Sequence, residues 1–133
     1  MGTDAAPKTT GQGVVHIEVL IAFARLMRER HGADVYLFGS RARGTARPDS
    51  DYDVVVVSEE FGGRPWHRRC PDWGELWSLA GGWRIGLDLH CFTPAEFREE
   101  LDGLGYLGQA KARGELVRIR PPARRPRAAR RSA

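Results

Sequence analysis

The chain has 133 residues, of which 41% are apolar, and a formal net charge of +4. This length fits a single domain without a separate substrate-binding domain, and no stretch approaches the ~20 apolar residues that span a membrane. The first residues lack a basic segment followed by an apolar one, so we expect no export signal and a cytoplasmic protein. Two cysteines, Cys70 and Cys91, are too few for a disulfide framework and lack zinc-ligand spacing, so we expect reduced thiols.

The positive charge is concentrated at the C-terminal end. Five of the 21 Lys and Arg lie in the last ten positions, which hold no acid, so residues 1–120 carry 16 cations against 17 anions. The body of the chain therefore lacks the charge of a nucleic-acid-binding domain. We expect residues 1–12 and the Pro-, Ala- and Arg-rich tail 121–133 to be disordered, with one folded domain over residues 13–120.

The first half of the chain predicts a helix, a strand, a short helical turn and a second strand. Apolar residues recur at helical spacing over residues 14–30, and Gly32 ends that helix. Residues 34–38 form a strand-prone apolar run that leads directly into Gly39-Ser40 and a helical turn. Residues 53–57 contain four consecutive valines and predict a strand that is buried on both faces of a sheet.

The second half predicts the remaining elements of a compact α/β sandwich. We expect a loop over residues 58–66, a helix with an apolar stripe over 72–80, and an alternating strand over 83–92. Thr93, Pro94 and Glu96 have the sequence of a capping box, which begins the next helix. A helix over residues 105–113 and a short strand over 115–120 complete a mixed order of helices and strands.

Three aspartates are candidates for an acidic site. Asp51 and Asp53 lie two residues apart at the start of a strand, so their side chains leave the same face and repel each other unless a cation compensates. Asp88 occupies the middle of a predicted strand, on the face opposite its apolar residues. If the two strands are neighbours, the three carboxylates converge as in a Mg²⁺ site. A DxD pattern taken alone is more often a solvated loop or an Asx-turn.

Calcium binding is a further alternative, because Asp49, Asp51 and Asp53 have the spacing of the first EF-hand ligands and Glu60 stands at position twelve. Position six of that loop requires glycine, but in this chain it is Val54, the first of the four valines. The run therefore predicts a strand and excludes an EF-hand. Asp49 is interpreted as a turn residue.

The Gly39-Ser40 pair predicts a phosphate-binding turn. A strand that turns through glycine into a helix directs backbone N–H groups and the positive end of the helix dipole toward one spot. Gly39 lets the backbone approach a ligand closely, and the Ser40 hydroxyl can donate to a phosphate oxygen. When such a pair occurs alone, a helix N-cap is its commoner role.

The combination of these motifs is more specific than its parts. The segment FGSRARGTARPDSDYDVVVV, residues 38–57, resembles the DNA polymerase β-like nucleotidyltransferases, whose pattern is Gly-Ser, two alternating acids and a third acid on a later strand. It is most similar to their minimal nucleotidyltransferase branch, and the resemblance covers about residues 14–119. It implies the polymerase β-like nucleotidyltransferase fold, an α/β fold with a small mixed sheet flanked by helices. WHRRCPDWGELW, His90 and the arginine tail depart from the pattern.

The resemblance implies a nucleotidyltransferase that transfers AMP from ATP to a hydroxyl group. It implies that Gly39 and Ser40 bind the triphosphate of ATP. It also implies that two Mg²⁺ ions are held by three carboxylates, those of Asp51, Asp53 and Asp88.

Other polar and aromatic residues near these motifs have two candidate roles each. Arg43 either neutralises phosphate charge or forms a structural ion pair. His90 shares a strand face with the third acid but is interpreted as a surface imidazole. Trp73 and Trp77 are interpreted as core or interface residues rather than a platform for a base.

The resemblance also implies a protein partner. Minimal nucleotidyltransferases often act as antitoxins that transfer AMP to a tyrosine of a HEPN-domain ribonuclease. A different class of function stays open, a binding module that neutralises its partner by occlusion, although a pure binder need not keep three costly acids together. In a third hypothesis the arginine tail binds RNA through phosphate contacts, against the simpler role of a solvated tail.

Overall fold

The computed structural model describes residues 16–47 and 49–122. The segment 1–12 and all but the first two residues of the tail 121–133, both expected to be disordered, lie outside the described residues. Within them, no helix has the length and apolar character to cross a membrane. The strands are β1 (Asp34–Phe38), β2 (Tyr52–Val57), β3 (Leu87–Phe92) and β4 (Val117–Ile119). The α-helices are α1 (Ile17–His31), α2 (Ser40–Arg43), α3 (Trp73–Leu79), α4 (Pro94–Asp102) and α5 (Tyr106–Ala112), and two 3₁₀ turns are η2 (Glu59–Phe61) and η3 (Trp66–Arg68).

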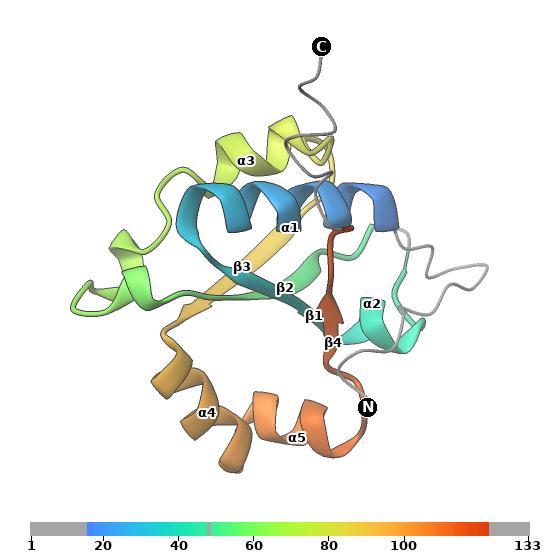
Figure 1. Cartoon of the computed structure of the whole chain (residues 1–133). Coiled ribbons are helices and arrows are strands. Elements are labelled where there is room, and N and C mark those ends of the chain that lie inside the picture. Colours follow the sequence, from blue (N-terminus) through green and yellow to red (C-terminus); the bar gives the residue numbers. More distant parts are fainter. Residues whose placement is uncertain (1–15, 48, 123–133) are drawn as a thin grey trace.

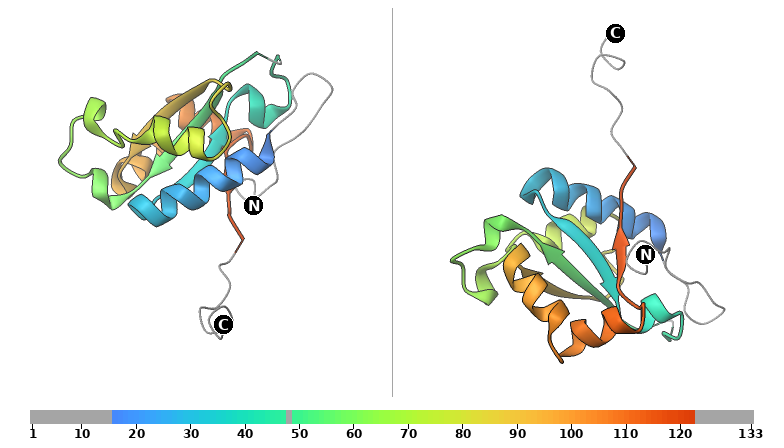
Figure 2. Two further views of the ribbon diagram at one scale, coloured as in Figure 1. Left: turned by 90° about the horizontal axis from the view of Figure 1, so that it is seen from above. Right: turned by 60° about the horizontal axis from the view of Figure 1, so that its bottom comes forward.

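The strands form one mixed sheet in the order β3-β2-β1-β4. β1 runs antiparallel to β2 and to β4, whereas β2 and β3 are parallel. Helices α1 and α3 lie side by side on one face of the sheet, and α4 and α5 cover the other (Figures 1 and 2). The predicted α/β fold, a small mixed sheet flanked by helices, is therefore confirmed.

The valine run of β2 packs in two directions because successive side chains of a strand point to opposite faces. Val54 and Val56 belong to the core under α1 and α3, whereas Val55 and Val57 belong to the core under α4 and α5. The same alternation places Asp53, the residue before the valines, on the face of Val55 and Val57. Asp53 consequently faces the same side of the sheet as α4 and α5.

Two expected elements differ in the structure. The expected loop 58–66 contains η2, where the Ser58 hydroxyl accepts a hydrogen bond from the backbone N–H of Glu60 at 3.1 Å. The expected strand 83–92 begins only at Leu87. Before it, the backbone N–H of Ile85 donates to Gly82 at 2.8 Å, and the Trp77 indole donates to the Ile85 carbonyl at 2.8 Å. These bonds form a turn, so the strand is shorter than the alternating sequence pattern predicted.

The predicted capping box begins α4. The Thr93 hydroxyl accepts from the backbone N–H of Glu96 at 3.1 Å, and the Glu96 carboxylate accepts from the backbone N–H of Thr93 at 2.9 Å. Both bonds satisfy N–H groups that the first turn of a helix leaves unpaired. The helix α4 is thereby fixed at the end of β3, on the face that carries Asp53.

Candidate active site

Three adjacent strands bring the glycine turn and two of the aspartates into one row. Phe38 of β1 is the register partner of Asp53 of β2, and Asp53 is the register partner of Asp88 of β3. Gly39 follows Phe38 directly, with φ at +80°. A Cβ at Gly39 would lie 2.6 Å from Oδ2 of Asp53. The turn thus requires glycine both for its backbone conformation and for its close approach to the carboxylate.

Asp53 and Asp88 form an acid pair without a compensating Lys or Arg. Among the described residues, no Lys or Arg makes a salt bridge with either carboxylate or with Asp51. Burial, and after it the repulsion of Asp88, raises the pKa of Asp53 above its usual value, while nearby His90 acts in the opposite direction. Uncompensated carboxylate oxygens held at one point fit a hard divalent cation.

Asp51 lies at the margin of this pair. It is exposed and precedes β2, and its Oδ1 packs so closely against Gly86 that a Cβ there would overlap it. Its charge contributes to the raised pKa of Asp53, so it is near the pair. It is nevertheless not a member of the group Asp53, Asp88 and His90, whose candidate ligand atoms all lie within 4.8 Å of one another.

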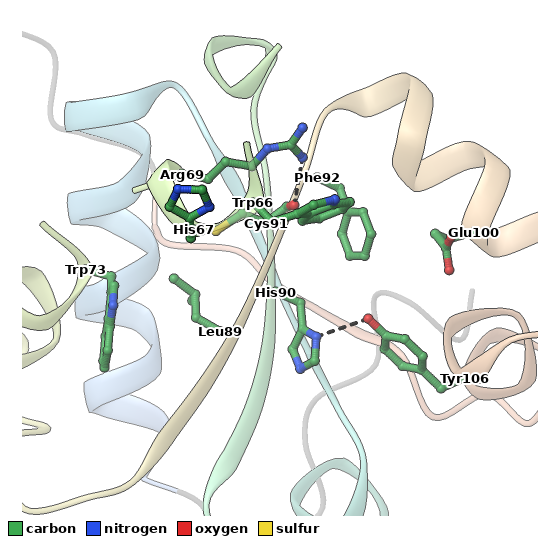
Figure 3. A pocket seen from close by; sticks show the side chains of 10 residues that line it. All are labelled: Trp66, His67, Arg69, Trp73, Leu89, His90, Cys91, Phe92, Glu100 and Tyr106. Carbon is green, nitrogen blue, oxygen red and sulfur yellow. Dashed lines mark hydrogen bonds between the residues drawn. The ribbon is translucent and has the colours of Figure 1, made fainter. Parts of the chain in front are cut away.

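His90 is partly buried beside the acid pair. Its side chain is 26% exposed, and Nε2 lies 3.4 Å from Oδ2 of Asp88. Nδ1 is hydrogen-bonded to the Tyr106 hydroxyl at 3.0 Å (Figure 3). The centroid of the His90 ring lies 5.3 Å from that of Phe38 and 5.4 Å from that of Tyr106. The centroids of Phe38 and Tyr106 are 5.5 Å apart. The imidazole is therefore held from two sides.

A pocket of about 490 Å³ follows the outer edge of β3 next to these residues (Figure 3). His90 and Tyr106 line it at the end near the acids, and Trp66 and His67 of η3 line it at the other. Arg69 also lines the latter end, and its guanidinium donates to the Cys91 carbonyl at 3.1 Å. In the strand order, Gly39 follows β1 on one side of β2 and this pocket follows β3 on the other, and Tyr106 also lines a smaller pocket beside Gly39.

Residues 20–123 match the family model described as a nucleotidyltransferase domain. The chain belongs to the nucleotidyltransferase domain family. This match confirms the resemblance of residues 38–57 to nucleotidyltransferases. No curated protein matches at a significant level.

Two solved structures are similar to this nucleotidyltransferase. A proposed nucleotidyltransferase from Sulfolobus solfataricus is 21% identical, with 62% of this chain and 71% of that chain covered and a TM-score of 0.47. A structure of a toxin-antitoxin with AMP-PNP is 19% identical, with 81% of this chain and 75% of that chain covered and a TM-score of 0.45.

The nucleotidyltransferase motif also contains cations, whose roles the sequence left open or missed. Arg43 makes an ion pair, with Nη1 3.3 Å from Oε1 of Glu115, and it also lines a pocket of about 180 Å³ beside Gly39, so its role in binding phosphate stays a prediction. Arg41 is only 2% exposed, donates to the Ser50 carbonyl at 2.7 Å and lies over the Tyr52 ring at 4.5 Å. Arg41 thus fixes the loop between the glycine turn and β2, a role that its position among exposed arginines did not indicate.

Trp77 and both cysteines lie in the core of the nucleotidyltransferase, whereas Trp66, Trp73 and Trp83 are exposed. The prediction of a core position is confirmed for Trp77 but not for Trp73, which is 38% exposed and lines the pocket along β3. Cys70 and Cys91 are both free and buried. Burial raises the pKa of the Cys91 thiol to about 11, so this thiol stays protonated at neutral pH.

Proposed function

We propose that this chain transfers the AMP group of ATP to a hydroxyl group of a partner protein, with the help of a divalent cation. The family supports a transferase that uses nucleoside triphosphates and Mg²⁺. The observation that carries the proposal is the uncompensated pair of Asp53 and Asp88 directly beside the Gly39 turn. A pair of acids that costs folding energy is explained when a cation and a phosphate chain occupy the space next to it.

In this proposal the glycine turn and the acids bind different parts of the substrate complex. Gly39 and Ser40 bind the triphosphate, while Asp53 and Asp88, with Asp51 at the margin, hold the metal. When bound, the cation stabilises phosphate charge and lowers the pKa of the attacking hydroxyl. The acceptor oxygen forms a bond to the α-phosphorus as the bond to pyrophosphate breaks. Asp88, whose side chain is 58% exposed, accepts the hydroxyl proton.

The order of the strands supports a direction for the two substrates. An in-line displacement needs the attacking and leaving oxygens on opposite sides of the phosphorus. Gly39 lies on the β1 side of Asp53, and Asp88 lies on its β3 side. We therefore assign the triphosphate to the side of Gly39 and the acceptor hydroxyl to the pocket along β3.

The nature of the acceptor rests on the resemblance of residues 38–57 to minimal nucleotidyltransferases. On that basis the partner is a HEPN-domain toxin, the acceptor is one of its hydroxyl side chains, and this chain is the antitoxin. The alternative is that the chain neutralises its partner by occlusion and transfers nothing. The two functions differ in one observable, the covalent state of the partner after exposure to ATP.

Mass spectrometry of the partner tests the proposal. The full chain is incubated with ATP, Mg²⁺ and the protein encoded beside it, and the intact mass of that protein is measured. We expect the mass of one AMP to be added by the wild type and by Asp49→Asn, an exposed turn residue of the same motif, but not by Asp53→Asn. A tight complex whose partner gains no mass would establish occlusion and overturn the transferase.

A further inference from the structure

We propose that His90 is a further ligand of the divalent cation and that its imidazole makes the site prefer Mn²⁺ to Mg²⁺. This inference rests on the proposed function, because it takes Asp53 and Asp88 to be metal ligands. It goes beyond that function by assigning a nitrogen ligand and a metal preference to this chain.

The position of Nε2 is the first observation. Asp88 and His90 lie two residues apart on β3 and therefore share a face, and Asp53 is the register partner of Asp88. One ligand atom from each of the three residues lies within 4.8 Å of the others. Nε2 is buried and makes no hydrogen bond with the described residues. A buried polar nitrogen that faces two carboxylates needs a partner, and a shared cation supplies one.

The surroundings of the ring are the second observation. Metal-binding histidines commonly use their other nitrogen for a hydrogen bond that fixes the ring and its tautomer. Nδ1 of His90 has such a bond with the Tyr106 hydroxyl at 3.0 Å. A hydroxyl both donates and accepts, so Tyr106 suits the tautomer in which Nδ1 carries the proton and Nε2 is free to bind metal. The rings of Phe38 and Tyr106 hold the imidazole in place.

The mixed ligand set determines which metal the site prefers. Mg²⁺ strongly prefers oxygen ligands, whereas imidazole nitrogen suits softer first-row metals, and Mn²⁺ accepts both. Two carboxylates with one imidazole therefore bind Mn²⁺ more tightly than Mg²⁺. A site of carboxylates alone would show a smaller difference between the two metals.

A simpler role for His90 is an ion pair with Asp88, whose nearest oxygen is 3.4 Å from Nε2. That role predicts that loss of the imidazole changes stability but leaves the metal's ligand shell and its selectivity unchanged. The two roles are separated by a spectroscopic measurement on bound Mn²⁺.

Pulsed electron paramagnetic resonance of Mn²⁺ bound to the full chain provides this test. Inorganic triphosphate replaces ATP, because it contains no nitrogen that could couple to the metal. We expect a coupling to histidine nitrogen, seen as a change of its frequencies when the protein carries ¹⁵N-histidine. This coupling disappears in His90→Gln and persists in His67→Gln, which changes an exposed histidine of the neighbouring pocket.

Metal titrations of the same proteins give the second readout. Replacing His90 by glutamine is expected to weaken Mn²⁺ binding by about tenfold and Mg²⁺ binding by less than about threefold. Tyr106→Phe is expected to keep the nitrogen coupling and weaken Mn²⁺ binding by less than His90→Gln does, because Tyr106 only positions the ring. An unchanged ratio of Mn²⁺ to Mg²⁺ affinity in His90→Gln would contradict the metal preference.

The outcomes separate this inference from the proposed function. Mn²⁺ that binds the wild type without histidine coupling, and is lost in Asp53→Asn, overturns the role of His90 and supports the metal role of the aspartates. Mn²⁺ binding that is absent from the wild type, or unchanged by Asp53→Asn, overturns both.

Discussion

Two regions of the molecule each gather a histidine and carboxylates, but they are organised differently. One region joins the end of α1 to α3, where His31 is hydrogen-bonded through Nδ1 to Glu60 at 2.5 Å and through Nε2 to Asp72 at 2.9 Å. The other is the site of Asp53 and Asp88. We call the first the closed cluster and the second the open cluster.

The closed cluster satisfies its own charges. Arg30 lies 3.5 Å from Asp72, Arg64 lies 3.6 Å from Glu60, and the Cys70 thiol donates to Asp72 at 3.5 Å. Burial raises the pKa of Asp72, but its hydrogen bond with His31 and the charge of that histidine lower it, and the net shift is downward. The folded state therefore favours the ionised carboxylate, as expected of a structural network.

The open cluster lacks these partners. No Arg or Lys pairs with Asp53 or Asp88 within residues 16–47 and 49–122, and the pKa of Asp53 is raised by burial and by Asp88. Similar residue types thus have opposite electrostatic states in the two clusters. The difference shows that the missing counter-charge, rather than the presence of acids and a histidine, distinguishes a candidate binding site from a structural network.

The largest effect is expected when Asp53 of the open cluster is changed to asparagine. Transfer of AMP should fall by about 10³-fold or more, since a metal contributes several kcal/mol and each 1.4 kcal/mol is tenfold in rate. The free energy of unfolding should stay equal or rise, because a raised pKa means that the ionised carboxylate destabilises the fold at neutral pH. Transfer assays and urea unfolding measure both quantities. A lower free energy of unfolding in Asp53→Asn would contradict the claim that the charge of Asp53 lacks a partner in the open cluster.

The next effect is expected at the glycine turn. Gly39→Ala places a Cβ 2.6 Å from Asp53 Oδ2 at a φ of +80°, so the carboxylate must move and the backbone is strained. We expect transfer to fall about tenfold to a hundredfold, as is common for ~1 Å displacements of reacting groups. Gly63→Ala is the matched control, because φ there is +77° and no atom lies within 4 Å. It should show the backbone strain alone and keep its activity.

In the closed cluster, His31→Ala should affect stability rather than transfer. The change leaves Glu60 and Asp72 without their shared hydrogen-bond partner, which costs about 1–3 kcal/mol in unfolding free energy. The transfer rate per folded molecule should stay within about twofold, because the cluster is not part of the proposed chemistry. A loss of metal binding in this variant would show that the closed cluster, and not the open one, holds the cation.

The smallest effect concerns another satisfied acid, Glu96, which pairs with Arg69 at 2.6 Å and 3.0 Å. The hydrogen bonds with Arg69, opposed by burial, lower the pKa of Glu96 from 4.5 to about 2. Its stabilising contribution is therefore present above pH 4.5 and is lost as the pH falls toward 2. Glu96→Gln should make the melting temperature depend less on pH in this range. Glu99→Gln, which changes an exposed residue of the same helix, should leave that pH dependence unchanged.

The parts of the fold that depend on local sequence were predicted well. Residues 34–38 form β1 with the expected bounds, because a strand-prone run ends at a glycine turn. The capping box of Thr93 and Glu96 forms as expected, because both bonds lie within three residues. The convergence of Asp53 with Asp88 could be anticipated only on the assumption that β2 and β3 are neighbours, which the sheet order confirms.

The parts that depend on tertiary packing could not be predicted. The contact of His90 with Tyr106 depends on how a helix docks on the sheet, which the sequence does not specify. The Arg43 ion pair joins residues 72 positions apart, and no local pattern indicates such a pair. The late start of β3 follows from the bond between Trp77 and Ile85, which is also a tertiary contact.

Parallel reactions with ATP labelled at the α-phosphate and at the γ-phosphate test the central claim most directly. Each is incubated with the chain, its partner and a divalent cation, with Asp53→Asn as the matched negative control. We predict that the α-label, but not the γ-label, becomes covalently attached to the partner, and only with the wild type. Attachment of the γ-label, or equal attachment of the α-label by Asp53→Asn, would contradict nucleotidyl transfer at the open cluster.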